Sequence, residues 1–294
     1  MSTDTTVPND ASNQGPEVWR IEPTPPTIAG QLSALMRHRY LLWFFSVHSV
    51  FDLYRNSLFG ILWMVIRPLA LALPAVVVVG NLFGISVDPV PLPLFILVGL
   101  ASWTLFRRTL MHMTKGLLRN RNILQQVYIP PLLVVIASSA PGFIEFAVVF
   151  TLFLVAAIYY GPIAGVFYPS IGLSTLGLIP AVTLTFILAV AVGCFTSFMN
   201  AVARDTNLFL RYAISAWMLA TPVIYPIEII PEHYRWIMYL NPMTSVIELY
   251  RWALLGYGSM HWQYLGLAVI EIVALLMLGI WFFAKQQNRL FDHM

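Results

Sequence analysis

The sequence predicts an all-α integral membrane protein with six transmembrane helices, and two observations lead to this prediction. Hydrophobic residues make up 59% of the chain and charged residues only 10%, and the mean hydropathy of +0.77 is unusual for a soluble globular protein. Apolar stretches of about 20 residues, the length that crosses a hydrocarbon core, recur between Leu58 and Ala284. They lack the alternation of barrel strands, so helices are expected.

Two segments precede the spans. Residues 1–27 are polar, without the basic and apolar regions of a signal peptide, and we expect a disordered cytoplasmic tail. Residues 28–57 mix Leu and aromatic side chains with charged ones, which predicts an amphipathic helix in the cytoplasmic interface. The alternative is a half-inserted seventh span, but central charges such as Arg39 and Asp52 are costly in lipid.

The six-span domain covers residues 58–284, and a cytoplasmic tail of residues 285–294 follows it. The spans are expected at Leu58–Phe83, Leu92–Met111, Leu132–Tyr160, Leu173–Val202, Leu208–Pro226 and Tyr264–Ala284.

Basic residues predict the orientation of these spans. Those before the first span, around the second and fourth connections and after the sixth all fall on one side. Only Arg235 and Arg251 occur in connections on the other side. By the positive-inside rule, both termini are cytoplasmic.

Apart from the basic residues counted with the cytoplasmic connections, three ionisable residues stand inside the predicted spans: Arg67, Glu145 and Glu271. Such residues mark candidate functional sites. A proton relay needs several in series, and we expect no His or Asp partner near these three, so a proton-coupled carrier is disfavoured. The structural alternative is an ion pair, with Arg67 and Glu145 as the candidate partners.

Residues 227–260, between the last two spans, are too polar for a span and too apolar for an ordinary loop. We expect two short re-entrant helices, with Pro231 and Pro242 as breakers and Asn241 as the cap of the second. Polar backbone at membrane depth is tolerated only where protein buries it or water reaches it. This predicts an outer gate.

Glu248 and Arg251 stand three positions apart in the second of these helices, a spacing at which they can pair. An exposed pair of little energetic value is the alternative.

The connection TKGLLRNRNILQQVYIPP, residues 114–131, is basic, helix-forming and longer than a turn requires. It is suited to dock a soluble partner, although a plain positive-inside loop has the same composition.

Five motifs occur in order between Arg55 and Gly256: RNSLFGILWMVIRPL, NRNILQQVYIPP, ARD, TPVIYP and LNPMTSVIELYRWALLG. Together they resemble the successive signatures of type-2 ABC exporter permeases that move lipid-linked polysaccharides. The resemblance implies a homodimer working with two copies of a separate nucleotide-binding subunit. The sequence contains no GxxxxGK[ST] phosphate loop, so ATP and Mg are expected on that subunit and no cofactor on this chain.

The resemblance also assigns roles to residues. The coupling helix that contacts the ATPase would include Arg119, Asn120, Arg121, Asn122, Gln125 and Tyr128. The junction of the interfacial gate helix with the first span would include Arg55, Gly60 and Trp63. The outer gate would include Pro231, Asn241, Pro242, Glu248 and Arg251.

Aromatic residues near the span ends are candidates for the polymer channel: Trp63, Trp103, Phe106, Trp217 and Tyr225. Sugar rings stack on aromatic faces, so such a group would let a polymer slide. An interfacial aromatic belt is the alternative for each single residue.

The implied function is export of a polyprenyl-pyrophosphate-linked polysaccharide, of O-antigen or galactan type, across a bacterial inner membrane. Alternatives are an exporter of teichoic acid or of small hydrophobic molecules and, in another class, a membrane-embedded glycosyl- or acyltransferase. The chain itself would not be an enzyme. The expected contacts are membrane lipids and the lipid-linked glycan, with no nucleic acid and no metal site.

Overall fold

A computed structural model describes residues 30, 35–54, 62–126, 129–165, 168–169, 172–203 and 205–293, without the side chains of 52–54, 164 and 287–293. All regular structure in these residues is helical. The helices are α2 (Arg39–Tyr54), α3 (Leu62–Val76) continued by the π-helical η1 (Val77–Leu82), α4 (Leu92–Arg119), α5 (Arg121–Gln126), α6 (Pro131–Ala137), α7 (Ala140–Ala164), η2 (Leu173–Gly177), α8 (Leu178–Val202), α9 (Thr206–Leu219), η3 (Ile227–Ile229), α10 (Glu232–Tyr239), α11 (Pro242–Leu255) and α12 (Trp262–His293).

Five helical segments in the described part of the chain are long and apolar enough to cross a membrane: Leu62–Leu82, Leu92–Arg119, Pro131–Ile163, Leu173–Val202 and Trp262–Gln286. They coincide with the predicted first to fourth and sixth spans, which confirms a helical membrane protein. The predicted fifth span contains α9, whose 14 residues are too few to cross the bilayer as a straight helix. The number six therefore stays a prediction.

Proline determines where α9 ends. We expected a helix up to Pro226, but α9 stops at Leu219 and residues 220–226 are irregular. Pro222 has no N–H to donate, and its ring clashes with the carbonyl one helical turn earlier. A similar break separates α6 from α7, where Pro141 stands in the first turn of α7.

Two helices are longer than the spans predicted for them. α4 continues from Met111 to Arg119, and α12 continues past Ala284 to His293, through most of the predicted cytoplasmic tail. Apolar periodicity ends where the lipid-facing surface ends, whereas the backbone hydrogen bonds of a helix continue into the polar region.

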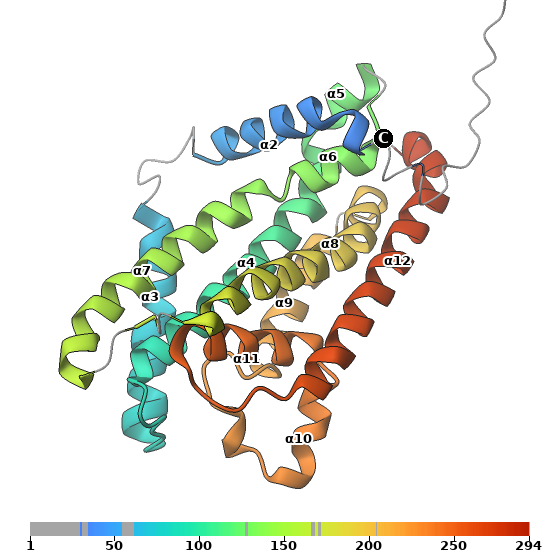
Figure 1. The fold of residues 1–294 in the computed structure, drawn as a ribbon. Helices are drawn as coiled ribbons and strands as arrows, with labels where there is room; N and C mark the ends of the chain where they lie inside the picture. The colour runs from blue at the N-terminus through green and yellow to red at the C-terminus, as the bar shows by residue number, and fades with distance from the viewer. Residues whose placement is uncertain are drawn as a thin grey trace, which may run out of the picture.

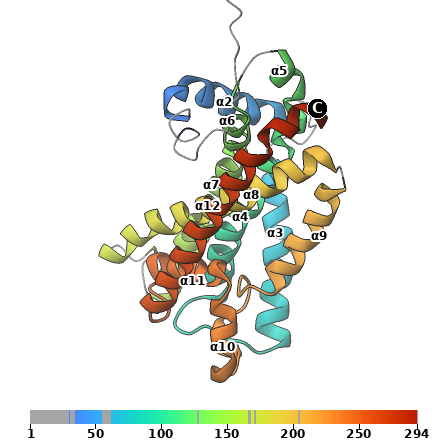
Figure 2. The same ribbon diagram turned by 90° about the vertical axis from the view of Figure 1, so that its right-hand side faces the viewer.

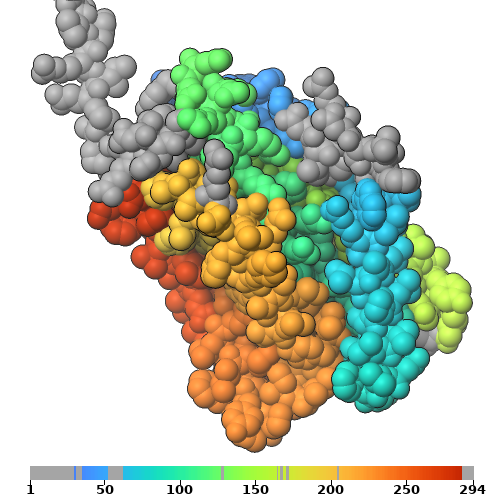
Figure 3. All heavy atoms as spheres, turned by 180° about the vertical axis from the view of Figure 1, so that it is seen from behind, coloured from blue at the N-terminus to red at the C-terminus, as the bar shows by residue number. Residues whose placement is uncertain are grey.

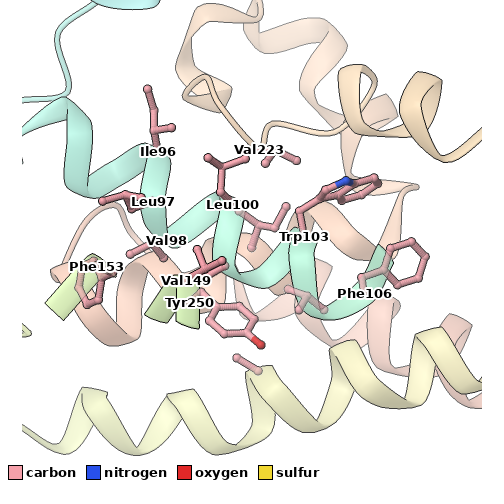
Figure 4. Packing of buried hydrophobic residues seen from close by; sticks show 14 of the residues in the cluster. Ile96, Leu97, Val98, Leu100, Trp103, Phe106, Val149, Phe153, Val223 and Tyr250 are labelled. Atoms are coloured by element: carbon pink, nitrogen blue, oxygen red, sulfur yellow. The ribbon is translucent and has the colours of Figure 1, made fainter. Parts of the chain in front are cut away.

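Helix α4 lies at the centre of the molecule, packed by α3, α7, α8 and α11, and α12 lies along α8 (Figure 1). Gly142 of α7 allows the close approach to α4, because a Cβ there would come within 3.0 Å of Thr109. Leu97, Leu100, Val149 and other buried apolar side chains fill the space around α4 (Figure 4).

The predicted interfacial helix is present as α2. It lies across one end of the bundle, near α5 and α6 and on the same side as the end of α12 (Figures 1 and 2). Phe45 and Ser49 are buried against the bundle, while Tyr40, Trp43 and Phe51 are exposed. This two-sided character suits an interface, although its place in the membrane stays a prediction.

Helices α3 and α9 lie on the same face of the molecule, on either side of α4 (Figure 3). Helix α3 exposes much of its apolar surface, including Leu62, Ile66, Leu71 and Leu73.

Candidate functional site

Helix α5 forms a short projection at the α2 end of the bundle. Asn120 connects it to α4: its side-chain Nδ2 donates to the Gly116 carbonyl at 2.9 Å, and its own carbonyl accepts from Ile123 and Leu124. Leu124 is 4% exposed and joins a core cluster with Phe45 of α2. The helix is therefore held by the apolar side chains of Leu124 and Ile123, which pack against this cluster, and by Asn120 at its start.

Arg119 provides a polar link between this region and α2. Its Nη2 donates to Ser49 Oγ at 3.0 Å, and Ser49 is buried in α2. A displacement of α5 would therefore reach α2 through this bond and the shared core.

The predicted ATPase-contact residues fall into two groups. Asn122 and Gln125 are exposed and Arg121 is half-buried, so their surfaces are accessible to a partner. Asn120 is buried as the helix connector, and Arg119 binds Ser49. Contact with an ATPase stays a prediction; Tyr128, together with Arg55 and Gly60 of the gate-helix junction, lies outside the described residues.

Three of the predicted channel aromatics meet at one point. Trp103, Phe106 and Trp217 form a cluster with ring centroids 5.0 to 6.3 Å apart, and the two from α4 extend from the same side of that helix (Figure 4). Trp103 and Phe106 are at most 2% exposed, so they do not form an open ladder in this protomer. Trp63 is exposed and Tyr225 is half-buried, and neither belongs to the cluster. A channel-lining role for the five stays a prediction.

Asn241 joins this cluster to the outer helices. Its Oδ1 accepts from Trp217 Nε1 at 3.1 Å and from the backbone N–H of Met243, and its Nδ2 donates to Thr221 Oγ1 at 2.8 Å. The bond to Met243 confirms Asn241 as the N-cap of α11. Pro231 and Pro242 precede or begin α10 and α11, as predicted; whether these helices dip into the membrane stays a prediction.

A cavity of ≈ 410 Å³ opens between α10, α11 and the start of α12. Its lining includes Glu228, Glu232, Arg235 and the group Tyr239, Glu248 and His261. The Tyr239 hydroxyl donates to the Glu248 carboxylate at 3.0 Å and lies 3.4 Å from His261 Nδ1. The Tyr239 ring also stacks on Tyr264 of α12, with centroids 3.9 Å apart. Tyr239 thus connects three helices.

The predicted pairing of Glu248 with Arg251 is wrong, and so is the alternative of an exposed pair. Arg251 is 2% exposed; its Nη2 donates to the Val223 carbonyl at 2.9 Å, and its Cζ lies 3.6 Å from the centroid of the Phe95 ring. Although the two residues share a helix, α11 packs Arg251 against α4 and the irregular segment, while Glu248 faces Tyr239. Arg251 therefore holds the 220–226 segment to the bundle.

We expect Glu248→Gln to remove a pH dependence of stability. Burial raises the pKa of Glu248 from 4.5 to about 7, against the lowering effects of the Tyr239 hydrogen bond and Arg251. A raised pKa in the folded state gives stability that is present in acid and is lost as the pH rises through about 7.

The variant should therefore be more stable than the native chain at about pH 8, by on the order of 2 kcal/mol, and nearly equal at about pH 4, below the unfolded pKa. Thermal unfolding at both pH values checks this. The same difference at both values would contradict ionisation of Glu248 as its cause.

A second polar group lies inside the bundle, and here two expectations are wrong. Glu145 of α7 pairs with Arg108 of α4, with Nε to Oε2 at 2.7 Å, rather than with Arg67. It also has a His neighbour, because His112 Nε2 lies 3.6 Å from its Oε1. Arg108 and His112 stand four positions apart on α4, which brings both to the same side of the helix. The spacing of Arg108 and His112 could be read from the sequence, but the register in which α7 packs against α4 could not.

In the described residues, no group of three or more His, Cys, Asp or Glu side chains has an arrangement that could hold a metal ion. Sequence reasoning also missed Ser49 and Tyr239, whose partners come from distant segments.

Comparison with known proteins identifies a family with which this chain shares most of its length. Residues 40–255 match the protein family described as ABC-2 type transporter. The chain is similar to the O-antigen export system permease protein RfbA of Klebsiella pneumoniae, with 24% identity over 237 residues, 80% of this chain and 88% of that protein. It is also similar to the protein of that name from Myxococcus xanthus, with 27% identity over 201 residues, 67% of this chain and 74% of that one.

Proposed function

Since the chain belongs to the ABC-2 type transporter family, we propose that it is the membrane-spanning permease of an ATP-driven exporter that moves a polyprenyl-pyrophosphate-linked polysaccharide across the bacterial inner membrane. The observation that carries this proposal is the similarity to O-antigen export permeases over 80% of the chain. The family match, residues 40–255, covers the described bundle from α2 to α11. The polysaccharide would be of O-antigen or galactan type.

The working complex would be a homodimer with two ABC ATPase subunits that bind ATP and Mg. Three features support this assembly: the sequence has no phosphate loop of its own, α5 presents Asn122 and Gln125 outward, and α3 exposes an apolar face suited to a second copy or to lipid. In this proposal α9 and residues 220–226 together make the fifth of six crossings, α10 and α11 re-enter from the outer face, and both termini are cytoplasmic.

The mechanism that we propose starts at α5. Closure of the ATPase on ATP would push α5, and the Leu124 core and the Arg119–Ser49 bond would pass this displacement to α2. Movement of α2 against α6 would then allow α3 and α9 to separate from their counterparts and open a path for the polymer. Asn241, bonded to Trp217 of α9, would carry the same movement to the outer helices.

Copurification with a candidate ABC ATPase, followed by ATP turnover with and without the lipid-linked glycan, tests the proposal. We expect a stable complex whose turnover rises with the glycan. Stimulation by small hydrophobic drugs alone, or by a teichoic-acid-type polymer alone, would identify a different exporter. Glycosyl or acyl transfer by the isolated chain would contradict the transport function.

Ser49→Ala should uncouple the ATPase from transport in part. It removes the acceptor of the Arg119 hydrogen bond, and a bond to a charged group contributes about 1.5 kcal/mol or more, which corresponds to roughly tenfold in an equilibrium. We expect export per ATP hydrolysed to fall severalfold in proteoliposomes while the complex still assembles. Ser86→Ala, which removes an exposed hydroxyl bonded to Asp88 at the start of the loop before α4, is the matched control. Equal coupling in the two variants would contradict this link.

A further inference from the structure

A cavity of ≈ 320 Å³ between α3, α4 and α7 has an unusual lining for a membrane-spanning region. Three arginines border it, Arg67 from α3 and Arg107 and Arg108 from α4, together with a single carboxylate, Glu145. Charged groups inside a membrane protein are costly unless they are paired or face a wet site. The groups that contact these arginines should therefore account for their charges.

Among the residues that the structure describes, one of the three arginines forms an ion pair with a carboxylate. Arg108 is paired with Glu145 at 2.7 Å. Arg67 lies over the Trp63 ring at 5.8 Å, and Arg107 forms no ion pair or hydrogen bond with any residue that the structure describes. Two guanidinium groups are thus left to interact with something else.

The same cavity contains a further unused donor. Trp103 lines it and is 2% exposed, and its buried Nε1 has no hydrogen-bond partner among the described residues. A buried N–H without a partner costs free energy, so its acceptor is expected to come from a bound group. Arg67, Arg107 and the Trp103 Nε1 can only donate hydrogen bonds, and the Thr104 hydroxyl in the same lining can also donate, which favours an anion with several oxygen acceptors.

A second copy of the chain is a poor source for this anion. The five candidate spans contain only two carboxylates, Glu145 and Glu271. Glu145 is already paired, and Glu271 lies on α12, which packs against α8 and α11 rather than near α3. The anion is therefore expected to come from the membrane or the substrate.

We propose that this cavity binds the phosphate group of a lipid, with Arg67 and Arg107 as its ligands and Arg108 positioned by Glu145. Phosphate offers the geometry that guanidinium forks recognise, and basic pockets between transmembrane helices bind anionic headgroups. Arg67 is exposed at the surface of the protomer, so a headgroup can reach the cavity from outside the bundle. This inference rests on the proposed function, so the first lipid to test as the source of the phosphate is the polyprenyl pyrophosphate anchor. The second is an anionic phospholipid.

The test is equilibrium binding of radiolabelled polyprenyl pyrophosphate to the permease–ATPase complex in phosphatidylcholine nanodiscs. Arg67→Gln and Arg107→Gln should each weaken binding about tenfold, whereas Arg107→Lys should retain most of it because the charge remains. Lys285→Gln, which removes an exposed cation on α12, is the matched control and should bind as the native complex does. Arg107 forms no ion pair or hydrogen bond with the described residues, so its glutamine variant should still assemble.

Competitors distinguish the two lipid sources. Displacement by polyprenyl monophosphate and inorganic pyrophosphate, but not by phosphatidylglycerol, identifies the isoprenoid anchor. Equal displacement by phosphatidylglycerol identifies a phospholipid site, and both results support a phosphate cavity. Native affinity in both glutamine variants would overturn it.

The outcome also separates this site from the proposed function. A native complex that binds phosphatidylglycerol through Arg107 but never binds polyprenyl pyrophosphate would keep the site and contradict the proposed substrate. If the complex exports glycan and binds its anchor equally well without Arg67 and Arg107, the result would support the proposed function and contradict the proposed phosphate site.

Discussion

Replacing Glu145 with glutamine is expected to destabilise the protein more than any other single conservative change in the bundle. Glu145 is the only carboxylate that meets the charges of α4 in the described structure, and it is 8% exposed. Removing one partner of a buried ion pair leaves the other charge uncompensated, which costs about 3–5 kcal/mol. In Glu145→Gln this affects Arg108 directly, with Arg67 and Arg107 on the same cavity.

Thermal unfolding of the purified protein measures this loss, which should lower the melting temperature by on the order of 10 °C. Glu271→Gln is the matched control, since Glu271 Oε2 is buried without a hydrogen-bond partner among the described residues. Neutralising it should leave stability unchanged or raise it. The double variant Glu145→Gln with Arg108→Gln should recover part of the loss. Equal melting temperatures for the two single variants would show that the Arg108 pair contributes little.

Gly99→Ala is expected to have the second largest effect, because α4 has no room for a side chain at this position. A Cβ there would collide with the Val223 carbonyl oxygen and come within 3.2 Å of Arg251 Nη2. These two atoms are bonded to each other, so neither can move without breaking the contact that holds residues 220–226. Overpacking of this kind costs about 1–3 kcal/mol.

Gly266→Ala is the control for this variant. Gly266 is also helical, and nothing lies within 4 Å of a Cβ at that position, so alanine there should stabilise the helix by about 0.5–1 kcal/mol. Opposite signs in thermal unfolding are expected, together with faster amide exchange across residues 220–226 in Gly99→Ala alone. Equal shifts in the two variants would contradict the close packing of Gly99.

The helices were predictable from the sequence to the extent that local rules determine them. Apolar length located the spans, and Pro231, Asn241 and Pro242 located the outer helices, because breakers and caps act within a few residues. The shortness of α9 was not predicted, because apolar composition continues through Ile224 while Pro222 ends the helix.

The partners of the charged side chains were not predictable from the sequence, even where two candidates lie three positions apart. Arg67 was the candidate partner of Glu145, and Arg251 was that of Glu248. The structure gives these residues other partners, because helix packing selects the partner. The partner of Arg119 is 70 positions away and that of Arg251 is 28 positions away. No local sequence pattern predicts contacts between residues so far apart in the chain. These contacts depend on how α2, α4 and α11 pack together.

The uninterrupted length of α4 has a thermodynamic consequence. Its 28 residues, Leu92–Arg119, extend about 42 Å. Phe95, whose ring contacts Arg251, lies near one end, and Asn120 joins the other end to α5. One continuous helix thus contacts α11 at one end and joins α5, the proposed contact with the ATPase, at the other. If α4 shifts as a unit, binding at its two ends is coupled, and the coupling is reciprocal. If ATPase binding changes the affinity of the outer cavity for a ligand by some factor, that ligand must change the affinity of the permease for the ATPase by the same factor. A ligand that binds in the outer cavity would then change ATPase binding on the other side of the membrane through α4, without a separate receptor.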